Sequence, residues 1–161
     1  MGIFSNIYDE GTLRKIEFLR RIRLFEGISK KSLIHVLESL QERTYLKGET
    51  IFAEGDIGRA LFIDFSGKIT LTKLNPETGK AEPLAEVAPG EFFGEMALLE
   101  EMPRSAGAAA AEETQVFMLF KTKLESLLFS YPRIGVVIAS QLARILSARL
   151  RARTEKASAS D

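Results

Sequence analysis

Hydrophobic residues in the N-terminal part of the chain recur at helical spacing. The pattern predicts an amphipathic helix between residues 13 and 22, with basic side chains on its other faces. Its apolar face consists of Leu13, Ile16, Leu19 and Ile22. A second helix is predicted to begin with Ser29 as its N-cap. Its buried stripe consists of Leu33, Val36, Leu37 and Leu40. His35 falls within this second helix, where we expect a partly exposed histidine without a catalytic role.

Over residues 44–121 the pattern changes to short β-rich segments separated by glycine turns. These segments are TIFA, RALFIDF, KITLTKL, PLAEV and QVFMLF. Turn residues recur about every ten positions, a spacing typical of a compact antiparallel barrel or jelly roll. Within RALFIDF, the alternation predicts that Leu61, Ile63 and Phe65 point inward together, while Asp64 faces solvent.

The run GAAAA occupies residues 107–111. Alanine runs on their own favour a helix. In this context we instead predict a strand from Ser105 to Thr114, because small residues allow a ligand or a neighbouring backbone to approach closely.

After Lys121 the pattern is helical again. A short helix is predicted over residues 124–129 and, beyond Pro132, a long helix over residues 134–153. The long helix carries a narrow seam at steps of four, three and four residues. This seam consists of Ile138, Leu142, Ile145 and Arg149, with Leu146 and Leu150 beside it. It fits either a second copy of the chain, in a homodimer, or the chain's own barrel.

The charge balance limits the classes of partner. Lys plus Arg (22) equals Asp plus Glu (22), so no bulk field attracts the chain to nucleic acid or to an anionic membrane. Residues 49–120 nevertheless carry 13 acidic and 5 basic side chains. An anion bound in this acidic middle must be held by local donors, such as backbone N–H groups and one aimed arginine.

The composition argues against several kinds of chemistry. The chain has no cysteine and one histidine, so disulfides, thiolate catalysis and a metal centre are not expected. No apolar run reaches the roughly 20 residues that a membrane span needs. The first residues, MGIFSN, resemble neither a secretory leader nor a myristoylation site. We therefore expect a cytoplasmic protein that is not an enzyme.

The stretch GEMALLEEMPRSA contains the most specific candidate chemistry. At Gly94 we predict a tight turn into a short helix, whose first N–H groups would point outward. Arg104, stiffened by the preceding proline, offers a planar fork for two phosphate oxygens, and Ser105 adds a hydroxyl. A carboxylate beside a phosphate is repulsive unless it accepts a hydrogen bond from the same ligand. We therefore expect Glu95 to accept one from a ribose 2′-hydroxyl.

The spacing of these residues resembles the phosphate-binding cassette of the cyclic nucleotide-binding domain family. The resemblance extends to FLRRIRLFEGISKKSL, to YLKGETIFAEGDIGRALFIDFSGKITL and to YPRIGVVIASQLARIL, and covers roughly residues 16–150. It implies an eight-stranded antiparallel β-roll with flanking helices, the last of which is a moving lid, and a cyclic AMP (cAMP) or cyclic GMP (cGMP) ligand. The residues that it places around the sugar and phosphate are Gly94, Glu95, Met96, Ala97, Arg104, Ser105 and Ala106.

Two features depart from the family's pattern. Gly107 and Ala108 stand where relatives usually carry a bulkier β-former, which predicts a looser pocket floor. On the long helix, Arg149 and Leu150 replace the Thr-Ser pair that meets adenine in activator-like relatives. Arg149 can stack over either purine, so it is a candidate base contact. On balance we favour cAMP as the ligand.

These observations predict one cyclic nucleotide-binding domain. Residues 1–43 would form N-terminal helices, 44–121 the β-roll with its cassette, 122–155 the lid and dimerisation helices, and 156–161 a tail. Ligand binding would pass through the C-terminal helices to an unidentified protein effector.

Two further alternatives concern the output. A helix-turn-helix after the long helix would take about 60 more residues, so direct DNA binding is not expected. A degenerate fold that serves as a protein-interaction scaffold without ligand is the alternative function. The alanine run at 107–111 keeps this alternative open.

Overall fold

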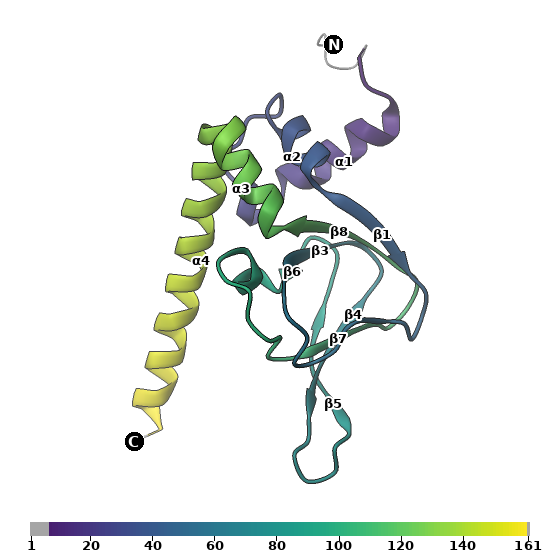
Figure 1. Ribbon diagram of the computed structural model, residues 1–161, viewed down its shortest axis with the longest axis vertical. Coiled ribbons are helices and arrows are strands. Elements are labelled where there is room, and N and C mark those ends of the chain that lie inside the picture. The colour runs from purple at the N-terminus through teal and green to yellow at the C-terminus, as the bar shows by residue number, and fades with distance from the viewer. Residues whose placement is uncertain (1–6, 161) are drawn as a thin grey trace.

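The computed structural model of the chain describes residues 7–160 (Figure 1). The MGIFSN stretch discussed above lies outside the described residues. The described part of the chain has a helical layer, a β-roll and one long helix beside both. The helical elements are α1 (Glu10–Arg20), η2 (Arg23–Phe25), α2 (Leu33–Ser39), η3 (Glu95–Leu98), α3 (Lys121–Ser130) and α4 (Pro132–Ala159).

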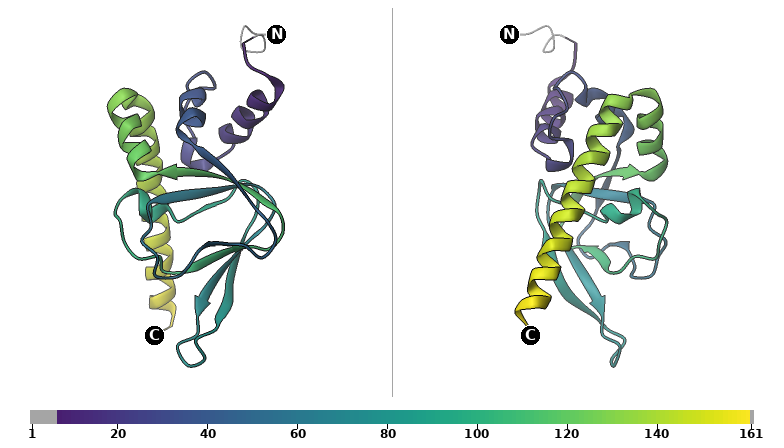
Figure 2. Two further views of the ribbon diagram at one scale, coloured as in Figure 1. Left: turned by 45° about the vertical axis from the view of Figure 1, so that its right-hand side comes forward. Right: turned by 90° about the vertical axis from the view of Figure 1, so that its left-hand side faces the viewer.

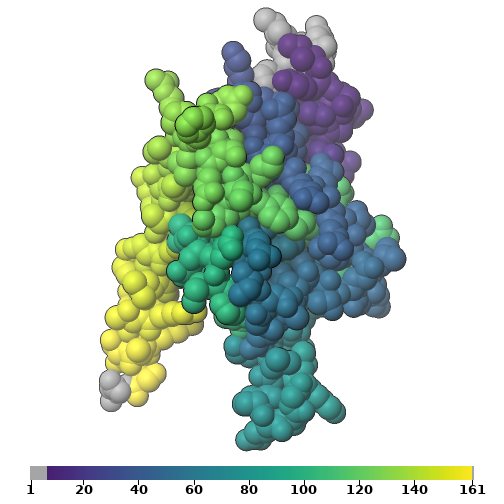
Figure 3. Space-filling view, in the orientation of Figure 1, coloured from purple at the N-terminus to yellow at the C-terminus, as the bar shows by residue number. Residues whose placement is uncertain are grey.

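Eight strands form the roll, in two antiparallel four-stranded sheets ordered β1-β8-β3-β6 and β2-β7-β4-β5. The strands are β1 (Gln41–Tyr45), β2 (Thr50–Phe52), β3 (Ala60–Ser66), β4 (Ile69–Leu74), β5 (Ala81–Val87), β6 (Phe92–Phe93), β7 (Gly107–Ala110) and β8 (Thr114–Phe120). The predicted eight-stranded antiparallel β-roll with flanking helices is therefore confirmed. Figure 3 shows the hairpin of β4 and β5 projecting from the body.

The alanine run forms β7, as predicted, although the strand spans Gly107–Ala110 rather than Ser105 to Thr114, and Thr114 is the first residue of β8. It pairs with β2 on one side and with β4 on the other, and Ala108 and Ala110 are buried in the roll. A Cβ atom on Gly107 would lie 2.8 Å from the hydroxyl oxygen of Thr72. Small residues are thus required here by the close approach of a neighbouring strand.

Strand β3 is buried on both faces. Leu61 and Ile63 pack against the helical layer, together with the partly buried Phe65, whose ring meets that of Phe18 edge-on at 4.8 Å. The opposite face of the strand lines the roll interior. The prediction that Asp64 faces solvent was wrong, because Asp64 is 0% exposed. The alternation was correct, but the face opposite the helices is the inside of the roll.

The N-terminal helices differ from prediction at their ends. Helix α1 begins after Asp9, whose carboxylate accepts the Thr12 N–H at 2.8 Å, and its apolar face continues to a buried Ile22 beyond the helix. Helix α2 begins four residues after Ser29, whose hydroxyl accepts the Ser32 N–H in the preceding turn. The prediction that His35 lies in the second helix and is partly exposed is confirmed, since this α2 residue has a side chain 33% exposed.

Helix α4 runs from the helical layer along one side of the roll, as the two views of Figure 2 show. It continues to Ala159, so the prediction of a tail beginning at residue 156 was wrong. Three of the four seam residues pack into the chain's own core. These residues are Ile138, Leu142 and Ile145. Most of the seam therefore packs within the chain's own fold, which was the second of the two alternatives given for it.

Candidate functional site

The turn that starts η3 is set by Gly94. This residue has a φ of 74°, in the left-handed region that an L side chain rarely adopts. The turn joins β6 to η3 and directs the next residue, Glu95, inward, where it is only 6% exposed. A Cβ atom at Gly94 would also lie 2.5 Å from a guanidinium nitrogen of Arg104. Glycine is required here by both the backbone conformation and the neighbouring arginine.

Arg104 is fixed at both its backbone and its side chain. Its N–H donates to the Asp56 carbonyl at 2.7 Å, and its carbonyl accepts the Gly55 N–H at 2.8 Å. The guanidinium donates from Nη2 to the Ala60 carbonyl at 2.7 Å and from Nη1 to the Gly94 carbonyl at 3.3 Å. Two neutral carbonyls thus orient the side chain and leave three of its N–H donors for another partner.

No carboxylate among residues 7–160 lies within ion-pair distance of the Arg104 guanidinium. The guanidinium carbon instead lies 4.2 Å from the ring centroid of Phe52 and 5.6 Å from that of Phe62. Burial lowers the pKa of Arg104, and the charge of Asp56 opposes the shift. Because arginine stays protonated in proteins, a half-buried positive charge remains without a carboxylate partner in the described part of the chain.

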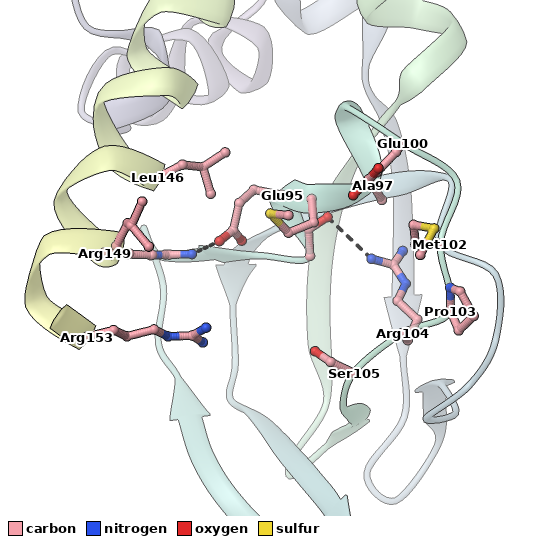
Figure 4. Close-up of a pocket in the computed structure, with 14 residues that line it drawn as sticks. Glu95, Ala97, Glu100, Met102, Pro103, Arg104, Ser105, Leu146, Arg149 and Arg153 are labelled. Carbon is pink, nitrogen blue, oxygen red and sulfur yellow. Dashed lines mark hydrogen bonds and ion pairs between the residues drawn. The ribbon is translucent and has the colours of Figure 1, made fainter. Parts of the chain in front are cut away.

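Glu95 has a different partner. One of its carboxylate oxygens forms an ion pair with the Arg149 guanidinium of α4 (Figure 4). The Glu95 side chain is 8% exposed, and that of Arg149 is 51% exposed. Burial lowers the pKa of Arg149, and the charges of Arg153 and Arg23 lower it further. The two predicted recognition residues, Glu95 and Arg104, are therefore neither turned to solvent nor paired with each other.

A cavity of about 640 Å³ separates these groups. In Figure 4, Arg104 and Arg149 lie on opposite sides of it, with Glu95 between them. Its lining includes six of the seven residues predicted for the sugar and phosphate, as well as Arg149, the candidate base contact. Ala106 is not part of the lining. The predicted residues that line the cavity are Gly94, Glu95, Met96, Ala97, Arg104 and Ser105.

Several residues that line the cavity were not predicted from the sequence. Gly58 is one of them, and a Cβ atom there would lie 2.9 Å from Nε of Arg104. A clue was available in the two glycines of EGDIG, which mark a turn but do not reveal what lies beside it. Arg153 was also detectable, because it follows Arg149 by one helical turn. The other lining residues outside the predicted set are Glu100, Met102, Pro103, Leu146 and Leu150.

The model of the family described as "Cyclic nucleotide-binding domain" matches residues 42–131. The chain therefore belongs to the cyclic nucleotide-binding domain family, which confirms the resemblance found in the sequence. The Cyclic AMP receptor protein of Thermus thermophilus is 39% identical to it over 128 residues, which are 80% of this chain and 57% of that protein. This chain thus spans little more than half of that relative.

Two solved structures are also similar to this chain. The catabolite activator protein of Thermus thermophilus has a TM-score of 0.75 and 37% identity, and the match covers 84% of this chain and 62% of that one. The regulatory domain of Toxoplasma gondii PKA, crystallised with cAMP, has a TM-score of 0.65 and 30% identity, and the match covers 74% and 45% of the two chains.

No helix within residues 7–160 is long and apolar enough to cross a membrane. Within the same range, no group of three or more His, Cys, Asp or Glu side chains is arranged to hold a metal ion.

Proposed function

We propose that this chain binds a cyclic mononucleotide in the cavity between η3 and α4 and acts as a sensor without catalytic activity. The observation that carries the proposal is Arg104. It is a half-buried guanidinium, fixed by the Ala60 and Gly94 carbonyls, with free donors and no carboxylate partner among the described residues. A phosphate monoanion is the complement of such a group, because a planar fork can donate to two of its oxygens.

The rest of the cavity suits a ribose and a base. Glu95 lies on the same turn as Gly94 and would accept the ribose 2′-hydroxyl, while Ser105 lies beside Arg104 in reach of the phosphate. Arg149 enters from α4, on the opposite side from Arg104, where the base would lie (Figure 4). Two similar proteins favour cAMP over cGMP as the ligand, since one is a cyclic AMP receptor protein and the other was crystallised with cAMP.

Thermal unfolding with and without nucleotide tests this proposal. A ligand present at about 100 times its Kd stabilises a protein by about 2.7 kcal/mol. We expect such a shift with cAMP for the wild type and for the control variant Arg144→Gln, whose side chain lies on α4 outside the cavity. Losing charged hydrogen bonds at Arg104 weakens binding by roughly 10- to 150-fold.

At the same cAMP concentration, a 100-fold weaker Arg104→Gln variant would gain only about 0.4 kcal/mol. An equal shift in Arg104→Gln and in the wild type would show that the phosphate does not bind at Arg104. Linear AMP serves as the specificity control.

The ion pair between Glu95 and Arg149 favours a second candidate, a scaffold that retains the fold without the ligand. In that case the carboxylate has a permanent protein partner. A scaffold would show no shift with cAMP or cGMP in any of the three proteins, whereas a sensor shows it in the wild type and the control.

The output would pass through α4 to a protein effector or to a second copy of the chain. Because most of the seam is buried in the core, a homodimer would use the residues that α4 leaves exposed. Val136 is 56% exposed and Leu150 is 67% exposed. These two are therefore the large apolar side chains that α4 leaves exposed for a dimer partner to cover.

A further inference from the structure

Large apolar side chains gather at the edge of the cavity, on η3 and on the two loops beside it. Met96 and Leu99 lie three residues apart at η3, and side chains at this spacing share one face of a 3₁₀ helix. Ile57 lies beside Met102, because the Gly58 N–H donates to the Met102 carbonyl at 2.9 Å. The chain thus brings two pairs of apolar residues to the same part of the surface.

These four side chains, Ile57, Met96, Leu99 and Met102, form a surface that we call the apolar rim. Each of them is 47–55% exposed. Met96 and Met102 also line the cavity, so the two pairs meet at its edge, and Figure 3 shows residues 95–104 at the surface beside α4. Exposed apolar side chains that gather in one place mark a docking site, and methionine suits such a site because its side chain adapts to a partner.

The charge around the apolar rim is negative. The two segments that carry it, residues 54–59 and 95–104, contain five acidic and two basic side chains. Asp56 and Glu100 form no ion pair in the described part of the chain. Of the two basic side chains, Arg104 is held inside the cavity, and the other pairs with a third carboxylate. The rim therefore complements a partner that is both apolar and basic.

The backbone and the charge at this surface decide which kind of partner fits. An extended peptide adds to an open sheet edge, but the loop at Ile57 already pairs with Pro103 in an antiparallel bridge. An anionic lipid surface or a nucleic acid would be repelled by the carboxylates. A basic amphipathic helix suits both features, because its apolar face would cover the half-exposed side chains while its lysines or arginines meet the carboxylates.

We infer that the apolar rim is a docking site for a basic amphipathic helix of another protein. The inference goes beyond the proposed function, since docking needs no nucleotide. An effector bound there would contact Met96 and Met102, the two rim residues that also line the cavity.

The test uses two model peptides, one of leucine and lysine and one of leucine and glutamate, with the leucines at helical spacing in both. Binding to the full chain is measured by fluorescence anisotropy in the absence of nucleotide. We expect the lysine peptide to bind about 10-fold or more tightly than the glutamate peptide. The double variant Ile57→Ser/Leu99→Ser should bind the lysine peptide about 10-fold more weakly than wild type, because it loses two half-exposed apolar contacts.

The matched control is Leu84→Ser. Leu84 is 61% exposed on β5, with a glutamate two residues away on either side, so it tests general adhesion to an exposed leucine beside carboxylates. We expect it to leave peptide binding unchanged. Equal binding of the two peptides, or an equal loss of binding in Leu84→Ser and the double variant, would overturn the inference.

Titration with cAMP separates this inference from the proposed function. Neither Ile57 nor Leu99 lines the cavity, so the double variant should bind cAMP as wild type does. Far-UV circular dichroism checks its folding, and if it does not fold, Leu99→Ser alone should weaken peptide binding by about threefold. Sedimentation tests a second copy of the chain as the occupant. A wild-type dimer that the double variant abolishes would overturn the inference.

Discussion

The buried carboxyl of Asp64 gives a stability prediction that is independent of any ligand. Asp64 is 0% exposed, and neither of its side-chain oxygens has a hydrogen-bond partner within residues 7–160. Burial raises its pKa to about 6, the charges of Glu112 and Glu91 raise it as well, and the nearby Ser66 backbone partly opposes them. The folded protein therefore favours the neutral form of this group.

The sign and size of the effect follow from linkage. The folded pKa of about 6 lies above the reference value of 3.8, so the unfolded chain ionises first as the pH rises. The group has no destabilising effect well below pH 3.8, and the loss of stability grows until the pH passes the folded pKa. Two pKa units correspond to about 3 kcal/mol in total, with about 1 kcal/mol of it present at pH 4.5.

The perturbation is Asp64→Asn, which keeps a polar group of similar shape and removes the charge. We expect the variant to be more stable than wild type by about 3 kcal/mol at pH 7.5 and by about 1 kcal/mol at pH 4.5. Titrating groups that do not interact with Asp64 are common to both proteins and cancel in the difference. The assay is urea unfolding followed by far-UV circular dichroism, since the chain has no tryptophan.

The exposed Glu77→Gln is the matched control, and its stability should stay within about 0.5 kcal/mol of wild type at both pH values. A difference between Asp64→Asn and wild type that does not change with pH would refute the reasoning. So would a wild type that is the more stable protein at pH 7.5.

Three further predictions follow from close approaches and exposure. Gly94→Ala should weaken cAMP binding in calorimetry by roughly 10-fold or more, because its Cβ would lie 2.5 Å from the Arg104 guanidinium; unchanged affinity would contradict this. Gly135→Ala should lower the free energy of unfolding in urea by about 1–3 kcal/mol, since its Cβ would lie 2.7 Å from the Leu128 backbone, and a gain would be the opposite result. Leu150→Glu should shift sedimentation toward the monomer if α4 dimerises, and unchanged association would exclude Leu150 from the interface.

Local patterns predicted much of the fold. Helical spacing, glycine turns and alternation identified the helices and the roll, because each reflects a short-range preference of the backbone. The strand at β7 was predicted from its context, against the helical preference of alanine. The burial of Asp64 could not be obtained in this way. Alternation separates the two faces of a strand, but it does not say that the second face also lies inside the molecule.

The candidate site shows the same limit. The cassette spacing identified Glu95 and Arg104, since both lie within one short loop segment. The partner of Glu95 lies 54 residues away on α4, and only the packing of that helix brings Arg149 to it. Gly58 likewise reaches the site through the pairing of its loop with residues 102–104. The sequence pattern did not reveal these contacts between distant segments of the chain.

The central claim is that the Arg104 guanidinium holds the phosphate of a cyclic mononucleotide. Isothermal titration of the wild-type chain with cAMP and with cGMP tests it most directly. We expect a saturable heat that fits one site per chain, with cAMP the tighter ligand. Absence of heat with both nucleotides up to millimolar concentration would contradict it.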